Sequence, residues 1–207
     1  VRAIVAYNTE SKITTTIRSN GVLMGQITPR SGTISGTSSI VQFDAWNWED
    51  AVYREDDGVH LNWTKMFNKW TGKKNKDYEK SITGLTAFFA NASAYSKEQN
   101  YLEKNLRFEA MRGIFNGEKT LYIHANFVKE ITEAIHFSKK YKVSKMVIVG
   151  GYDAWMVADM LKENKVSVIL KRVHSLPERQ EDDVNLSFKL PKMLYDAGVL
   201  CCLENYG

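Results

Sequence analysis

The chain has 207 residues, of which 43% are hydrophobic, and a net charge of +4 from 28 basic and 24 acidic residues. This length and composition suit a domain with a buried core and exclude a disordered protein. The basic surplus is spread along the chain except around residues 69–80, so charge and motifs indicate no nucleic-acid partner.

The two cysteines and the ends of the chain exclude further classes. Cys201 and Cys202 are adjacent in an expected strand, so the chain has neither a disulfide framework nor a zinc finger. No apolar run approaches the roughly 20 residues that a membrane span needs. The chain begins with Val1 and stops just after a strand, which indicates that both ends are cut, so a missing export signal says nothing about location.

The first part of the chain, residues 1–117, mixes short strands, loops and helices. Apolar runs predict strands, Gly/Ser/Thr-rich segments predict loops, and long helix-compatible segments predict helices. The pattern predicts a helix at 9–18, a strand at 22–27, a loop at 30–39, a strand at 40–43, a turn at 56–58, a strand at 59–63, a surface loop at 69–76, and two helices within 77–115 that are separated near 94–100.

The second part, residues 118–207, repeats a regular unit of an apolar strand followed by a helix. Strands that are apolar on both faces indicate a parallel sheet covered by helices, either doubly wound or closed as a barrel. In both architectures the active site lies at the carboxyl ends of the strands. The predicted strands are 120–125, 145–149, 166–170 and 199–203, and the predicted helices are 128–141, 153–164 and 191–197, with Pro191 in a first turn.

Five residues lie at or just past the carboxyl ends of these strands and are the candidate site residues. His124 has a geometric reason to face a ligand, and His174 either reaches the same cavity or lies on a surface loop. The pair Gly150 and Gly151 either lets backbone amides approach an anion or forms a tight turn. Glu204 comes directly after the last strand.

Other polar residues have simpler structural interpretations. Asp153 is expected to cap the helix that follows it, and His136 is expected to be solvated on a helix. His60 lies in a strand-like setting and is a weaker candidate than His124. The chain has no Gly-x-Ser-x-Gly elbow, P-loop or Gly-x-Gly-x-x-Gly fingerprint, so no serine hydrolase, NTPase or dinucleotide-binding function is indicated.

Family-like patterns occur in the segments 19–29, 34–39, 121–125, 145–155 and 190–199. Together these segments resemble the amidohydrolases related to imidazolonepropionase. The resemblance implies a metal-bearing (β/α)8 barrel, of which this chain is an incomplete part that lacks the first strand and its His-x-His pair. Residues 1–207 are then a single partial barrel domain.

The resemblance also implies roles for individual residues. His124 matches a metal ligand on the fifth barrel strand, and the implied metal is divalent, with zinc favoured. Two positions depart from the family pattern. Gly150 stands where active members have a second histidine, and Glu204 stands near a catalytic aspartate, for which it is a candidate replacement as general base.

Two functions of different class follow. In the first, the full-length parent hydrolyses a carbon-nitrogen bond of an amide or cyclic amide with metal-activated water, and the fragment itself is inactive and binds no complete metal centre. In the second, the chain is a non-catalytic barrel homologue that binds a small polar ligand or a protein partner. In both, exposed barrel edges favour self-association.

Overall fold

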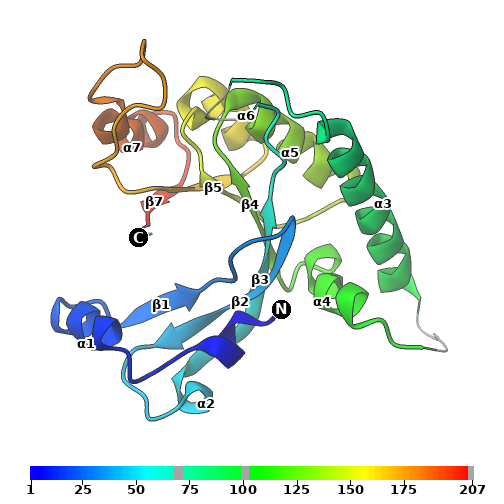
Figure 1. Ribbon diagram of the computed structural model, residues 1–207, viewed down its shortest axis with the longest axis vertical. Helices are drawn as coiled ribbons and strands as arrows, with labels where there is room; N and C mark the ends of the chain where they lie inside the picture. The colour runs from blue at the N-terminus through cyan, green and yellow to red at the C-terminus, as the bar shows by residue number, and fades with distance from the viewer. Residues whose placement is uncertain (68–71, 99–102, 205–207) are drawn as a thin grey trace.

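The computed structural model describes residues 1–67, 72–98 and 103–204 and contains one curved sheet of seven strands, in the order β1 to β7 (Figure 1). Strands β1 to β3 are antiparallel, whereas β3 to β7 are parallel. Within these residues β1 and β7 end the sheet and do not pair with each other, so the sheet is a half-barrel. The predicted α/β fold, an incomplete TIM-type barrel with parallel strands and crossover helices, is therefore confirmed.

The antiparallel part of the sheet begins the chain. Its strands β2 and β3 are long, and the register of their pairing shifts at three places, as at β-bulges. Figure 1 shows this part, with its own helices α1 and α2, extending as a separate lobe away from the helices of the parallel part. Its elements are η1 (Ala3–Ala6), α1 (Lys12–Ser19), β1 (Met24–Ile27), β2 (Ile34–Gln42), α2 (Trp48–Ala51) and β3 (Val52–Asn62).

The parallel part consists of strands joined by helices, as the repeating pattern predicts. Figure 1 shows α3 to α6 along the outer side of the curved sheet and α7 beside β7. The elements are α3 (Tyr78–Lys97), α4 (Leu106–Phe115), β4 (Thr120–Ala125), α5 (Val128–Lys140), β5 (Met146–Gly150), η2 (Ala154–Val157), α6 (Ala158–Glu163), β6 (Ser167–Leu170), α7 (Leu186–Asp196) and β7 (Cys201–Leu203).

The main hydrophobic core lies between the sheet and its outer helices. In β4, Leu121 and Ile123 are buried and alternate with Tyr122 and His124, which are only half-buried. This alternation directs the apolar side chains toward the helices and the polar ones toward the inner face of the half-barrel. Helix α5 contributes to this core the side chains of Ile131, Ala134, Ile135 and Ser138, which are buried at the predicted helical spacing.

Three local predictions are wrong. Most of the loop expected at 30–39 is strand β2, and the turn expected at 56–58 lies inside β3. Polar side chains in these strands pair with each other, so a buried strand can be rich in Ser, Thr and Asp. Pro191 lies in the middle of α7 and not in its first turn.

Two expectations concern the surface. In the described part of the chain, no helix combines the length and apolarity that a membrane crossing requires. The surface loop expected at 69–76 falls partly on residues 68–71, which lie outside the described residues.

Candidate functional site

Two histidines meet at the inner face of the half-barrel. His60 of β3 pairs in register with Tyr122 of β4, and Asn62 pairs with His124, so the two histidine side chains lie on one face of neighbouring strands. The Nδ1 atom of His60 lies 2.9 Å from the Nε2 atom of His124. The ring of Tyr122 stacks on His60 with a centroid distance of 4.6 Å. The pair is the centre of the candidate site.

Burial keeps both imidazoles neutral. His60 is only 2% exposed, and burial, together with the charge that His124 would carry, lowers the pKa of His60 to about 3. Burial and the nearby positive charge of Lys171 lower the pKa of His124 to about 4. At pH 7 the two rings therefore act as neutral hydrogen-bonding groups.

The hydrogen-bond partners of the ring nitrogens determine the tautomers of the two histidines. The Nε2 atom of His60 is buried and has no partner among the described residues. A proton on that atom would be an unsatisfied buried donor, which costs more than an unused lone pair. His60 therefore carries its proton on Nδ1 and donates it to Nε2 of His124, which leaves the proton of His124 on Nδ1.

A buried polar network supports the pair from one side. The carboxylate of Asp57, which is 4% exposed, accepts hydrogen bonds from Gln26 at 2.7 Å, Ser38 at 2.8 Å and Tyr122 at 3.1 Å. Burial and this carboxylate raise the pKa of Tyr122 to about 12, so the phenol stays protonated. The network fixes the ring of Tyr122, which in turn holds the ring of His60.

Glu204 and Lys171 follow the ends of the last two strands. The backbone N–H of Glu204 donates to Leu170 at 2.8 Å, which continues the pairing of β7 with β6. Burial raises the pKa of the Glu204 carboxyl, and the charge of Lys171 opposes this rise. Because Lys171 also lowers the pKa of His124, its charge acts on both predicted site residues.

The remaining predicted residues lie on the loops after β5 and β6. Gly150 lines an open pocket, whereas the N–H of Gly151 donates to Ala125 at 2.8 Å and is used within the fold. Both glycines have positive φ, and a Cβ on Gly150 would lie 2.4 Å from Oδ1 of Asn126. His174 is exposed, and its ring lies 5.5 Å from the ring of Phe188. The structure thus brings His174 to helix α7 and not to His124.

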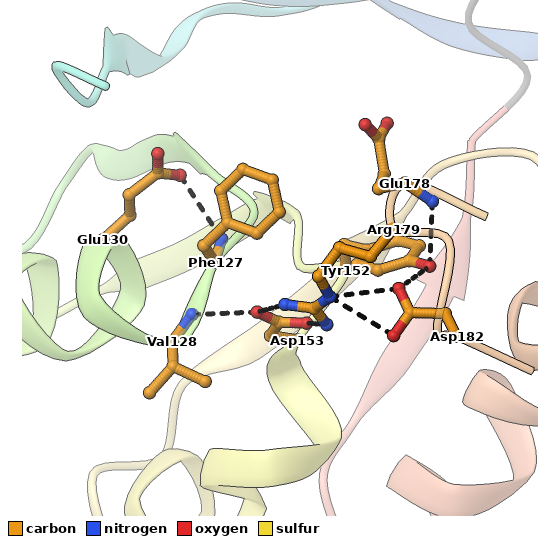
Figure 2. A network of polar contacts seen from close by, with 8 residues as sticks. All are labelled: Phe127, Val128, Glu130, Tyr152, Asp153, Glu178, Arg179 and Asp182. Carbon is orange, nitrogen blue, oxygen red and sulfur yellow. Dashed lines mark hydrogen bonds and ion pairs between the residues drawn. The ribbon is translucent and has the colours of Figure 1, made fainter. Parts of the chain in front are cut away.

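A network of charges fastens the segment 171–185 to the strand ends (Figure 2). Arg179 donates to both oxygens of Asp153, which is 2% exposed, and also to Asp182. Asp182 accepts a hydrogen bond from Tyr152 at 2.6 Å. These bonds raise the pKa of Arg179 and lower that of Asp182.

The role of Asp153 differs from the prediction. Its side chain makes no bond to the helix that follows it and instead accepts the N–H of Val128, the first residue of α5, at 3.3 Å. Glu130 accepts the N–H groups of Asn126 and Phe127 beside it. Asp153 therefore caps the preceding helix and binds Arg179, because its carboxylate points across the strand ends (Figure 2).

The segment 171–185 forms one wall of the open pocket at the carboxyl ends of β5 and β6. The other walls come from the end of β4, the loop after β5, and α7. The lining residues are Asn126, Gly150, Tyr152, Leu170, Lys171, Arg172, Ser175, Leu176, Glu178, Ser187 and Leu190. The sequence prediction missed all of these except Gly150, because most lie on loops without a motif.

His60 is a site residue that the sequence predicts only weakly. The signal is present in the strand Gly58 to Asn62, where buried apolar residues alternate with polar ones. The same alternation occurs in Thr120 to His124 of β4. Parallel pairing of two such strands brings their polar faces together, which a single sequence does not reveal because it leaves the register open.

Comparisons with known proteins agree with this fold. The crystal structure of an amidohydrolase from Thermotoga maritima resembles the chain with a TM-score of 0.80 and 18% sequence identity. The match covers 98% of this chain and 56% of that protein, so the chain spans little more than half of its length. No protein-family model matches the sequence, and no curated protein is significantly similar to it. At this identity the likeness shows a shared fold.

Proposed function

We propose that the chain is part of a barrel hydrolase that cleaves a carbon-nitrogen bond of an amide or cyclic amide. The half-barrel shared with the Thermotoga amidohydrolase supports this class. The segments that resemble imidazolonepropionase-related members support that branch of the family. The observation that carries the proposal is the pair of His60 and His124 at the strand ends, where barrel enzymes hold their catalytic groups.

Each polar residue at the carboxyl ends of the strands has a distinct proposed role. His124 presents its Nδ1–H group as a donor to a substrate carbonyl, while His60 fixes its tautomer and orientation. Glu204 is the general base, because burial raises the pKa of its carboxyl toward neutral pH, which makes the carboxylate a stronger base. Lys171 supplies positive charge near both residues.

The described residues do not fit a complete metal centre. No three His, Cys, Asp or Glu side chains in the described ranges lie close enough to hold an ion together. The 2.9 Å between the histidine nitrogens suits a hydrogen bond. With zinc-nitrogen bonds of about 2.0–2.1 Å it would give an angle of roughly 90° at the metal, well below the tetrahedral value. We propose zinc only for a longer protein in which other residues complete the ligand set.

The test uses the longest natural protein that contains this chain, purified without chelator. Its zinc, iron and manganese contents are measured by mass spectrometry, and hydrolysis is assayed on a panel of N-acyl and cyclic amides. We expect amide hydrolysis that falls by at least about 100-fold in H124A, the range for a lost catalytic group. Absence of hydrolysis across the panel would contradict the proposal.

A matched histidine variant controls for folding. H136A removes an exposed histidine on α5, far from the inner face, and is expected to retain full activity. H124N keeps a hydrogen-bond donor near the position of the imidazole. We expect it to fold, which its circular dichroism spectrum shows when compared with that of the original protein. If H136A lost activity as well, the loss of hydrolysis in H124A would reflect impaired folding.

The second candidate function is a non-catalytic barrel homologue that binds a small polar ligand or a protein partner. The lack of a three-residue ligand group among the described residues favours this alternative. Metal content separates the two functions. Stoichiometric metal that is lost in H124A excludes the binding-only alternative, whereas a metal-free protein without amidase activity supports it.

A further inference from the structure

A second cavity lies near the amino-terminal ends of β4 and β5, at the opposite edge of the sheet from the candidate site. It has a volume of about 440 Å³ and is lined by the carboxyl ends of α3, α4 and α5 and by residues just after them. Because α4 leads into β4 and α5 leads into β5, these helix ends lie where the two strands begin. Barrel enzymes hold their catalytic groups at the other edge, so this cavity is separate from the proposed active site.

The residues that line this cavity in the described part of the chain carry four cations and no carboxylate. Arg112 is balanced by Glu109, whose carboxylate lies 3.5 Å from its guanidinium. The other three cations are exposed lysines, and none of them forms an ion pair with a described residue. They are Lys97 at the end of α3, Lys140 at the end of α5, and Lys142 just after it.

The ends of the three helices account for part of this positive charge. A helix carboxyl end carries roughly half a negative charge, so a lysine there can serve only to balance the helix dipole. Three such ends together carry about one and a half negative charges, whereas each of the three lysines carries a full positive charge. About half of the lysine charge is therefore left for a ligand.

The lining also has a fixed aromatic wall and a neutral donor. Tyr141 donates its hydroxyl to the carbonyl oxygen of Thr86 at 2.8 Å, and its ring lies 5.5 Å from the ring of Phe89. The side-chain oxygen of Asn116 accepts the N–H of Glu118 at 3.1 Å, which leaves the amide N–H groups of Asn116 without a partner among the described residues. A fixed wall lowers the entropy that ligand binding would otherwise cost.

We infer that this cavity binds a small ligand that bears a diphosphate group, with Lys97, Lys140 and Lys142 as charged donors and Asn116 as a neutral donor. A lysine ammonium offers three rotatable donors and is a common phosphate ligand. Each phosphate group carries about 1.5 to 2 negative charges, so a diphosphate matches three lysines better than one carboxylate does. The cavity volume also falls in the range of about 300–1,000 Å³ that is typical of small-molecule sites.

Binding is measured by calorimetry on the 207-residue chain at constant ionic strength and without divalent cations. The probes are pyrophosphate, ADP and inorganic phosphate. We expect pyrophosphate and ADP to bind, and inorganic phosphate to bind at least about 10-fold more weakly, because it reaches fewer lysines. Tighter binding of ADP than of pyrophosphate identifies a nucleotide as the ligand, and the reverse order identifies a free diphosphate.

K142Q tests the assignment of the site to this cavity. It removes one charge-assisted contact and is expected to weaken pyrophosphate binding roughly 10- to 100-fold. K139Q is the matched control, because it removes an exposed lysine from the last turn of α5 that does not line the cavity. We expect it to weaken binding less than about 2-fold, since water and salt screen a charge that makes no contact with the ligand.

Three results would overturn the inference. The first is that neither pyrophosphate nor ADP binds. The second is equal weakening by K139Q and K142Q, which would show a diffuse attraction without a site. The third is tighter binding of a short oligouridylate than of ADP, which would assign the surface to nucleic acid. None of these results bears on amide hydrolysis, because the two sites lie at opposite ends of the strands.

Discussion

At the scale of single residues, the inner face depends on a glycine beside the histidine pair. A Cβ on Gly58 would lie 2.3 Å from Cε2 of Tyr122 and 2.6 Å from the carbonyl oxygen of Thr120. Moving the backbone of Thr120 would strain the strand pairing, and the Tyr122 ring is held by Asp57 and by stacking on His60. Gly58 therefore allows the flat packing of Tyr122 that supports the site.

We predict that G58A destabilises the protein by about 1–3 kcal/mol through overpacking. The control is G84A on the exposed side of α3, where nothing lies within 4 Å of the added Cβ. It is expected to stabilise the helix by about 0.5–1 kcal/mol. Urea denaturation followed by tryptophan fluorescence measures both, and equal stability of the two variants would show that the site tolerates a methyl group.

The histidine pair predicts a dependence of stability on pH. The folded protein holds the pKa of His60 at about 3 and that of His124 at about 4, below the ordinary 6.5. The unfolded chain therefore binds more protons as pH falls below 6.5, and stability is lost down to the folded pKa values. Each histidine contributes a slope of at most about 1.4 kcal/mol per pH unit.

The free energy of unfolding is measured between pH 7 and pH 5 with a chelator present. We expect it to fall over this range, and to fall less steeply in H124N, which removes one of the shifted groups. H136Q removes an exposed histidine instead and should retain the original slope. A slope that H124N leaves unchanged would show that the pair does not account for the loss.

At the scale of structural elements, Arg179 attaches the segment 171–185 to the ends of β4 and β5. Removing its side chain would leave the carboxylate of Asp153 buried without its cation. Such a group costs about 1–3 kcal/mol, less than a fully buried pair, because Arg179 itself is partly exposed to water. We predict that R179A destabilises the protein by this amount and loosens the segment.

Thermolysin tests the loosening, because the exposed Leu176 in the segment is a cleavage site that the substitution leaves intact. Cleavage near Leu176 is expected to be faster in R179A than in the original chain. K189A breaks the ion pair with Asp183 in the same region, where both side chains are exposed, and is expected to change neither cleavage nor stability. Equal cleavage of R179A and K189A would contradict the attachment.

The sequence predicts some elements well and others poorly for physical reasons. Strands β4, β5 and β6 are short apolar runs buried against helices, so hydrophobicity alone locates them. Strands β2 and β3 carry Ser, Thr and Asp side chains that bond to each other across the sheet, and their residues resemble loops. The bonding partners lie 19 residues apart, so local pattern does not contain the information.

The candidate site was predictable to the same limited degree. His124 was identifiable because it ends an apolar strand of a repeating unit. Its partner His60 lies 64 residues earlier and joins it only through the parallel register of β3 and β4. The role of Arg179 was hidden for a similar reason, since its buried partner Asp153 lies 26 residues away.

At the scale of the whole molecule, the half-barrel leaves two sheet edges. Strands β1 and β7 each have one neighbour in the described sheet, and Met24 and Leu203 on these strands are 41% and 57% exposed. Unpaired edges with apolar side chains favour pairing with another chain. We therefore predict that the 207-residue chain self-associates in a concentration-dependent manner.

Analytical ultracentrifugation measures the association. The double variant M24K/L203K places charges on both edges and is expected to shift the protein toward monomer. L106K introduces a lysine at a leucine that is even more exposed, at the start of α4 and away from both edges, and should associate as before. A monomer at every concentration in the original chain would contradict the prediction.

The carboxylate of Asp153 has a consequence for synthesis on the ribosome. It binds the first turn of α5 as well as Arg179, so it joins three successive β/α units through one buried charge. Until residue 179 leaves the exit tunnel, that charge has no cation and its burial is unfavourable. We expect the nascent half-barrel to stay loosely packed up to that point and to consolidate in one late step.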